Sequence, residues 1–272
     1  MTIPMQYALR RRMMPILGID VAALSITYTG AYTDYGMVTM SDGARYRLLA
    51  FTSSGTLSIE QPINCEVCVV GGGANGAKAA NGIGGAGGAG AYLKNQSVSA
   101  YNGGSVVVGA GQGVSSIADV SVNAVSGKNG GTGAGAHNAG TGDGISKYPF
   151  EDTGYSLWSG KPHCAGGGQG AYEYRNAYGN IRGYNGGNGG TNGSNGYPEG
   201  LNEIYNPSSG VGGSYGGGVG GNHASYNGGN ATYYGSGAGG GACYISNGTS
   251  YYNGGNGYQG IVYMRIPEDQ AA

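Results

Sequence analysis

The sequence predicts a mostly β and irregular protein with almost no α-helix, in which a small β region precedes a glycine-rich domain of packed polyglycine-II helices. Three observations predict this fold. Glycine supplies 63 of the 272 residues, several times the usual share of about 7 %. Short β-branched runs separated by Asp-Gly and Ser-Gly turns precede the glycine-rich part. Glycine then recurs at every third position in several later runs.

The β region is expected to span residues 25–70. Turns are predicted at Ser41-Asp42-Gly43 and at Ser53-Ser54-Gly55, where turn residues separate runs of strand composition. These runs lie at 25–29, 37–40, 46–52 and 56–59, and the mostly apolar run 65–70 completes the set. Later short runs, at 91–93, 105–108 and 117–125, also favour strands inside the glycine-rich domain.

Cys65 and Cys68 form a C-x-x-C pair, a spacing that in other settings indicates zinc binding or redox chemistry. Here the pair falls within the predicted strand 65–70, where residues three apart point to opposite faces. We therefore expect no metal site. We expect all four cysteines, which also include Cys164 and Cys243, to be reduced thiols packed as small hydrophobes.

The glycine-rich domain is expected to span residues 71–266. A polyproline-II helix has three residues per turn and no internal hydrogen bonds, so glycine at every third residue leaves one side bare. Bare sides let neighbouring backbones approach and exchange N–H···O=C bonds, which buried backbone groups require. The runs in step are 82/85/88, 84/87/90, 127/130/133, 187/190/193/196, 210/213/216 and 254/257/260. The interrupted runs and only 8 prolines argue against collagen.

A flexible coil is the alternative, because glycine-rich sequence is typical of linkers. Two flanking strands favour order. Residues 65–70 lead into the domain and residues 260–266 leave it, and both runs are apolar. Pairing them in one sheet avoids exposed apolar edges and brings the ends of the domain together. The domain is then an insertion closed by a sheet. Residues 1–24 form an N-terminal arm, and residues 267–272 form a polar tail.

Composition excludes several classes of function. Charged residues are 10 % of the chain and the net charge is −1, so binding to nucleic acid or insertion into a membrane is not expected. Gly71-Gly72-Gly73 follows a strand, but no helix pattern follows to receive a phosphate. His137, His163 and His223 lie far apart, and Trp158 is the single tryptophan. We expect no enzymatic activity, no catalytic residue, no metal and no cofactor.

Adhesion fits the aromatic composition. There are 24 tyrosines against 2 phenylalanines, and tyrosine beside asparagine is common at recognition loops because few rotamers are lost on binding. Tyr233-Tyr234 and Tyr251-Tyr252 are the strongest candidates, since adjacent residues of an extended chain cannot both point inward. The alternative is that the tyrosines cover the glycine array. The candidate receptor-binding residues are Tyr197, Tyr205, Tyr215, Tyr226, Tyr233, Tyr234, Tyr251 and Tyr252.

The N-terminal arm contains Tyr7-Ala8-Leu9 followed by Arg10, Arg11, Arg12, Met13 and Met14. Its composition suits a short helix or an extended arm, and a disordered basic terminus is the alternative. We expect residues 10–14 to attach the protein to a larger particle. No run has the length and apolar character of a signal peptide, so release by lysis inside an assembled particle is the expected route out of a cell.

Several segments resemble one family. They are 57–59 with 65–73, 91–93 with 106–111, 142–144 with 148–150, 161–168, 257–263, and the arm at 7–14. These segments are similar to glycine-rich bacteriophage tail and receptor-binding proteins from phages and prophages of gut bacteria. A looser parallel is the distal tail-fibre adhesins of T-even-like phages, from which the N-terminal half departs.

The resemblance implies a virion protein, most simply a tail-fibre tip or receptor-binding adhesin that recognises the host surface through Tyr/Asn-rich loops. The implied partners are other virion proteins, a host cell-surface glycan or protein, and further copies of the chain, with a trimer as one arrangement. The implied location is the virion, assembled in the host cytoplasm. The alternative is a non-adhesive virion component, such as a head fibre, capsid decoration or collar protein. An ice-binding or matrix protein is a third class.

Overall fold

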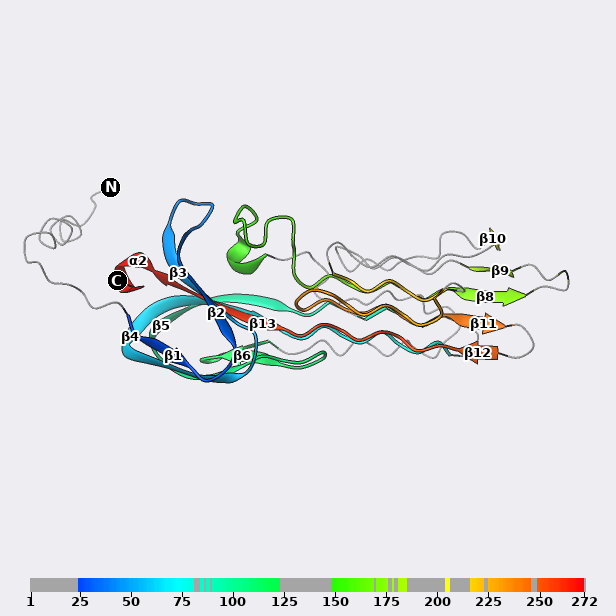
Figure 1. Ribbon diagram of the computed structural model, residues 1–272, viewed down its shortest axis with the longest axis horizontal. Coiled ribbons are helices and arrows are strands. Elements are labelled where there is room, and N and C mark those ends of the chain that lie inside the picture. The colour runs from blue at the N-terminus through cyan, green and yellow to red at the C-terminus, as the bar shows by residue number, and fades with distance from the viewer. Residues whose placement is uncertain are drawn as a thin grey trace, which may run out of the picture.

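The computed structural model describes residues 24–80, 84–85, 87–88, 90–122, 148–168, 170–175, 178, 181–184, 204–205, 216–222, 225–245 and 249–271. Within these ranges the protein is mostly β and irregular, as predicted. Among the described residues, helix is limited to the 3-10 turn η2 (Pro149–Glu151) and the short α2 (Glu268–Ala271). The molecule is elongated: a sheet region with α2 forms one end, and glycine-rich segments run from it to a second, smaller sheet at the other end (Figure 1).

The first sheet has eight strands in the order β2-β3-β13-β4-β5-β6-β7, with β1 paired to β4. Its strands are β1 (Ile26–Tyr28), β2 (Tyr32–Thr39), β3 (Arg45–Phe51), β4 (Gly55–Val70), β5 (Leu93–Val107), β6 (Ser115–Ile117), β7 (Val120–Val122) and β13 (Ile261–Pro267). The predicted turn at 41–43 is present, with Gly43 at a φ of 82° and its N–H donating to the Met40 carbonyl. That left-handed conformation favours glycine.

Several expected boundaries differ from the structure. The runs 56–59 and 65–70 are one strand, β4, whose pairing with β5 is irregular between Ser58 and Cys65. Pro62 lies in that irregular stretch, where a missing N–H is tolerated. The end of the run 91–93 and most of the run 105–108 likewise belong to one strand, β5, which spans Leu93–Val107. Residues 93–122, which we placed in the glycine-rich domain, therefore add β5, β6 and β7 to the first sheet.

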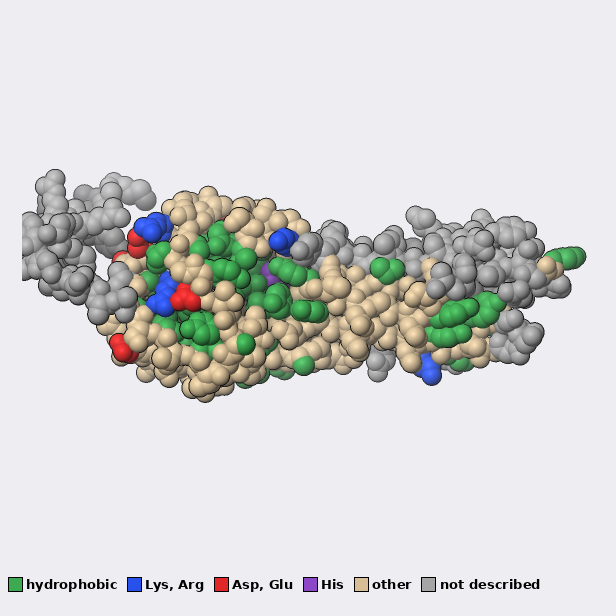
Figure 2. All heavy atoms as spheres, viewed as in Figure 1, with side chains coloured by type: hydrophobic (Ala, Val, Ile, Leu, Met, Phe, Trp, Pro, Cys, Tyr) green, Lys and Arg blue, Asp and Glu red, His purple; other side chains and the backbone are tan. Residues whose placement is uncertain are grey.

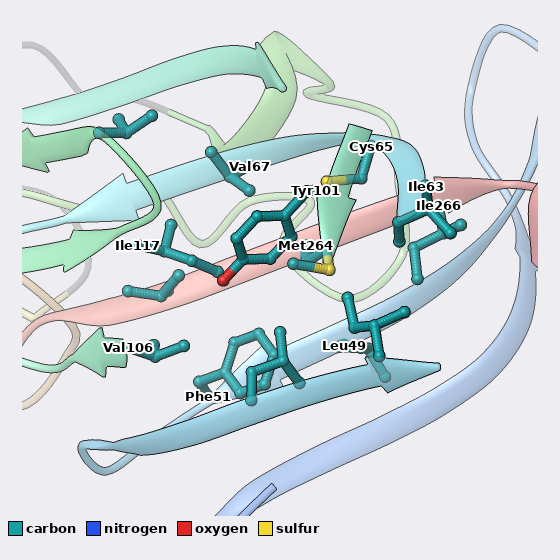
Figure 3. Packing of buried hydrophobic residues seen from close by; sticks show 14 of the residues in the cluster. Leu49, Phe51, Ile63, Cys65, Val67, Tyr101, Val106, Ile117, Met264 and Ile266 are labelled. Carbon is teal, nitrogen blue, oxygen red and sulfur yellow. The ribbon is translucent and has the colours of Figure 1, made fainter. Parts of the chain in front are cut away.

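Two apolar clusters lie on opposite faces of this sheet. In the larger one, side chains from β3, β4, β5, β6 and β13 meet, as Figure 3 shows for Phe51, Val67 and Ile117. Cys65 belongs to this cluster and Cys68 to the other. The opposite orientation predicted for the C-x-x-C pair is thus confirmed, and all four cysteines are buried thiols. Leu24, which we assigned to the arm, is buried in the larger cluster.

Strand β13 lies between β3 and β4 and is antiparallel to both. Ile261 is opposite Val70 in the pairing with β4. The last residue of the strand that leads into the glycine-rich domain therefore adjoins the first residue of the strand that leaves it. The expected closure of the domain by a sheet is confirmed. Because β13 is in the middle of the sheet, its apolar residues are covered on both faces, and Val262, Met264 and Ile266 are fully buried.

The glycine-rich segments form a laterally bonded array around residues 235–242. N–H groups of this central segment donate to a different neighbour at each residue: Gly237 to Ala165, Ala238 to Ala74, and Gly239 to Gly229. The next three N–H groups, of residues 240–242, donate to the same three neighbouring segments in the same order. Their acceptors are the carbonyls of Gly168, Ala77 and Tyr226. Carbonyl groups of the central segment accept from three other neighbours, at 85–88, 218–221 and 252–258. Six surrounding segments and a three-residue period are the geometry of packed polyglycine-II helices.

Bare Cα atoms are required for this packing. A Cβ added at Gly239 would lie 1.9 Å from the Val219 carbonyl oxygen, and one added at Gly241 would lie 2.0 Å from that of Tyr252. Both distances are far inside van der Waals contact. At both positions a carbonyl group of the neighbouring segment occupies the space that a Cβ atom would need. The prediction that glycine allows neighbouring backbones to approach closely is therefore confirmed.

The array ends in a five-stranded sheet, which we call the distal sheet, of order β10-β9-β8-β11-β12. Its strands are β8 (Tyr172–Arg175), β9 (Ile181–Tyr184), β10 (Ile204–Tyr205), β11 (Cys243–Ile245) and β12 (Thr249–Tyr251). Strand β11 continues the central segment and pairs with β8 in parallel and β12 antiparallel. The central segment thus runs from the first sheet region to the distal sheet (Figure 1).

Replacing Gly239 with alanine should destabilise the protein by about 4 kcal/mol or more, the range reached when backbone must shift. Gly229→Ala is the control, because its added Cβ would lie 3.2 Å from the nearest atom, the Val219 carbonyl oxygen. It should cost far less. Chemical denaturation of both variants measures the difference. Equal, small losses would show that the array does not depend on close backbone approach.

Candidate functional site

Two exposed aromatic side chains of the glycine-rich domain lie near the distal sheet. Tyr178, in the turn that joins β8 to β9, is 89 % exposed, and Tyr251, at the end of β12, is 39 % exposed. Figure 2 shows hydrophobic side chains, a class that includes tyrosine, gathered over the end of the molecule where β11 and β12 lie. The described surface between the two ends is mostly backbone and uncharged polar atoms. The distal end therefore presents exposed aromatic rings.

Tyr226 and Tyr252 stack on each other near this end. Their ring centroids are 4.3 Å apart and the ring planes differ by 12°. Tyr244 of β11 lies beside them, with its centroid 5.8 Å from that of Tyr226. Both stacked rings are half-buried. Each therefore covers part of the array while its remaining surface faces solvent.

The stack arises from two copies of one short sequence. Tyr-Asn-Gly-Gly-Asn occurs at 226–230 and at 252–256, and the two copies lie side by side with their residues aligned. The sequence prediction weighed each tyrosine singly and did not include this pairing. The repeated sequence is the signal that indicates it, because two identical segments that lie parallel and in register place identical residues side by side. A third copy begins at Tyr184, and its residues from 185 on lie outside the described part of the chain.

Tyr233 and Tyr234 do not lie in the extended chain that the alternation argument assumed. The pair is in a turn that includes Gly235 at a φ of 70°, so the alternation of an extended chain does not apply. Both rings contact His163, with centroid distances of 4.9 Å and 6.1 Å. Both side chains are half-buried. They belong to the junction between the array and the first sheet, away from the distal sheet.

His163 is the centre of this junction. It is fully buried, and its Nε2 lies 3.1 Å from the hydroxyl of Tyr263, on β13. Its Nδ1 has no hydrogen-bond partner. Burial lowers the pKa of His163 to about 3, because a charged imidazolium would lose its hydration. A neutral, enclosed imidazole is a packing element and cannot take a proton from a substrate in solvent.

The other candidate residues are placed as follows. Tyr205 lies on β10, at one edge of the distal sheet. Tyr197, Tyr215 and the arm residues Arg10, Arg11, Arg12, Met13 and Met14 lie outside the described residues, as do His137 and His223. Trp158 is fully buried and stacks edge-on against Tyr263 and Tyr155. It therefore lines no cleft.

The described residues hold no cluster of His, Cys, Asp and Glu side chains suited to a metal ion. Burial raises the pKa of the Cys65 thiol to about 12 and that of Cys243 to about 11, which keeps both protonated and unreactive. The N–H groups of Gly71, Gly72 and Gly73 donate to the carbonyls of Tyr92, Gly113 and Tyr258. These donors are used within the protein and do not form a phosphate cradle.

No helix among the described residues has the length and apolar character needed to cross a membrane. Comparison of the chain with protein-family models, with curated proteins and with solved structures found no match.

Acidification should destabilise the protein through His163. The unfolded chain binds a proton near the ordinary pKa of 6.5, whereas the folded protein excludes it down to about pH 3. Stability is therefore greatest above pH 6.5 and falls between pH 6.5 and 3 by up to about 1.4 kcal/mol per pH unit. Denaturation at several pH values should show a shallower fall in His163→Gln than in the wild type. Identical slopes would contradict this assignment.

Proposed function

We propose that the protein is a bacteriophage adhesin, a tail-fibre tip or receptor-binding protein, whose distal sheet and adjoining tyrosines face the host cell. The observation that carries the proposal is the distribution of features along the molecule. The first described residue, Leu24, is anchored in the first sheet, and the exposed rings of Tyr178 and Tyr251 lie at the far end of the array. An elongated body with its N-terminal attachment at one end and exposed aromatic rings at the other suits adhesion.

The construction of the array also supports this role. Main-chain hydrogen bonds hold the glycine-rich segments in place, so tyrosines at the distal end can remain exposed, as Tyr178 and Tyr251 do. Recognition residues on loops that a rigid body positions are the common arrangement in binding proteins. The sequence resemblance to glycine-rich phage tail proteins is the reason for proposing that the protein belongs to a phage particle and that its ligand is on a host cell.

A non-adhesive virion protein is the second candidate, and one observation favours it. Tyr226 and Tyr252 stack on each other, and Tyr233 and Tyr234 contact His163, so four of the eight candidate tyrosines already contribute to the fold. A head fibre or decoration protein needs that stability and no receptor surface.

Removal of residues 1–23 should abolish incorporation into particles while the protein stays folded. The truncation keeps Leu24, which is buried in the first sheet and whose carbonyl accepts a hydrogen bond from Arg47 Nη1. Particles assembled with the truncated protein would be purified and probed with an antibody. Normal incorporation would remove the arm, with Arg10 to Met14, as the attachment element.

Replacing Tyr178 and Tyr251 together with alanine should reduce adsorption to host cells by roughly tenfold or more, the effect typical of central aromatic contacts. Tyr35→Ala is the matched control, because Tyr35 is 41 % exposed but lies on β2 of the first sheet. It should adsorb like the wild type. Equal adsorption of all three proteins, with unchanged melting temperatures, would favour the non-adhesive virion role.

A further inference from the structure

The two aligned copies of Tyr-Asn-Gly-Gly-Asn form a ladder, which we define as residues 226–230 and 252–256. Asn227 Oδ1 accepts the N–H of Asn253 at 3.1 Å, and the N–H of Gly228 donates to the Asn253 carbonyl at 2.9 Å. Three residues on, Asn230 Oδ1 accepts the N–H of Asn256 at 2.8 Å. The N–H of Ala231 donates to the Asn256 carbonyl at 2.9 Å. The two rungs are therefore equivalent.

The first role of these asparagines is structural. Segment 252–258 directs the N–H groups of residues 252, 255 and 258 to the central segment. The N–H groups of Asn253 and Asn256 point away from the central segment, and the Asn227 and Asn230 side chains accept them. A side-chain amide thus replaces the carbonyl that a further polyglycine-II helix would supply.

This bonding also fixes the orientation of each amide. Because Oδ1 of Asn227 and of Asn230 accepts a main-chain N–H, the Nδ2 group must point away from segment 252–258. Among the described residues no acceptor binds either Nδ2 group, and all four asparagines of the ladder are exposed. Three residues of polyproline-II helix span about 9 Å. The surface therefore presents oriented amide donors at a regular spacing of about 9 Å.

The surroundings select the class of ligand. The sequence contains no Asp, Glu, Lys or Arg between residues 204 and 264. Lys78 is exposed on a neighbouring segment whose next residue, Ala79, donates its N–H to the Tyr252 carbonyl. Glu173 of β8 is paired with Tyr244, whose ring lies beside that of Tyr226. A polyanion needs several cations, so nucleic acids and acidic polymers do not fit. The Tyr226–Tyr252 stack begins the ladder and offers aromatic surface to a sugar ring.

We propose that the ladder binds a neutral polysaccharide, with a sugar ring on the tyrosine stack and hydroxyl groups accepting from Asn227 and Asn230 Nδ2. A polysaccharide is the neutral ligand whose hydroxyl groups recur regularly along a chain, as the amide donors do here. The inference rests on the proposed adhesive function and names the part of the host surface that is bound.

The test is the double variant Asn227→Asp/Asn230→Asp. Aspartate keeps the acceptor oxygen that holds the array edge but lacks the outward N–H donors. Binding is measured on an array of immobilised dextran, levan, galactan and lipid-free neutral O-polysaccharides from gut bacteria. The wild type should bind at least one of them. The variant should bind it at least about tenfold more weakly, the loss expected for two hydrogen bonds, with an unchanged melting temperature.

Asn64→Asp is the matched control. Asn64 is exposed in the first sheet, and its Oδ1 accepts the N–H of Ala100 at 3.1 Å, so it has the same chemistry at a distance from the ladder. It should bind as the wild type does. In contrast, Asn227→Ala/Asn230→Ala removes both the acceptor and the donor, and should lower the melting temperature as well as binding.

Two results would overturn the inference: a wild-type protein that binds none of these polysaccharides, or an aspartate variant that binds them as well as the wild type does. Adsorption to host cells, measured in parallel, separates this failure from failure of the proposed function. If the wild type and the Asn227→Asp/Asn230→Asp variant adsorb to cells equally well, the protein is an adhesin that binds through another surface. A wild-type protein that adsorbs to no cell refutes the adhesive function itself.

Discussion

The lateral main-chain hydrogen bond between extended segments is the interaction on which the rest of the molecule depends. Polyproline-II segments have no internal hydrogen bonds, so each N–H and C=O group of the array must find a partner on another segment. Residues 235–242 achieve this with six neighbours. The neighbours approach so closely that their carbonyls occupy the places of missing side chains. Glycine is thus the residue that makes the bonding possible, at a cost of about 0.5–1 kcal/mol each relative to alanine.

The first sheet fixes the register of the array. Val70 and Ile261 are opposed in the pairing of β4 with β13, and the array begins directly beyond them, where Gly73 N–H donates to the Tyr258 carbonyl. The next bonds follow at three-residue intervals, from Gly76 to Gly255 and from Ala79 to Tyr252. Apolar burial in the sheet therefore determines which glycine faces which neighbour. The Asn227 and Asn230 amides then close the outer edge.

Much of this could be predicted from residue patterns, and the failures have physical causes. The opposite orientation of Cys65 and Cys68 followed from strand alternation, and the threefold glycine period indicated the lateral bonding. Local patterns could not show that residues 93–107 form one long strand, because Gly103 and Gly104 lie within it and glycine usually marks a strand end. They could not place Tyr233 and Tyr234 on His163 either, since a turn and a distant contact decide that position. The ladder required knowledge of which segments are neighbours.

The central position of β13 has a consequence for biosynthesis. Strands β3 and β4 do not pair with each other, because β13, near the C-terminus, separates them. The central segment of the array also comes late in the chain, after most of its neighbours. Until β13 has been synthesised, strands β3 and β4 therefore lack the partner that joins them. Completion of the sheet depends on β13 and completion of the array on the central segment, so folding is dominated by contacts between distant parts of the sequence and should be slow.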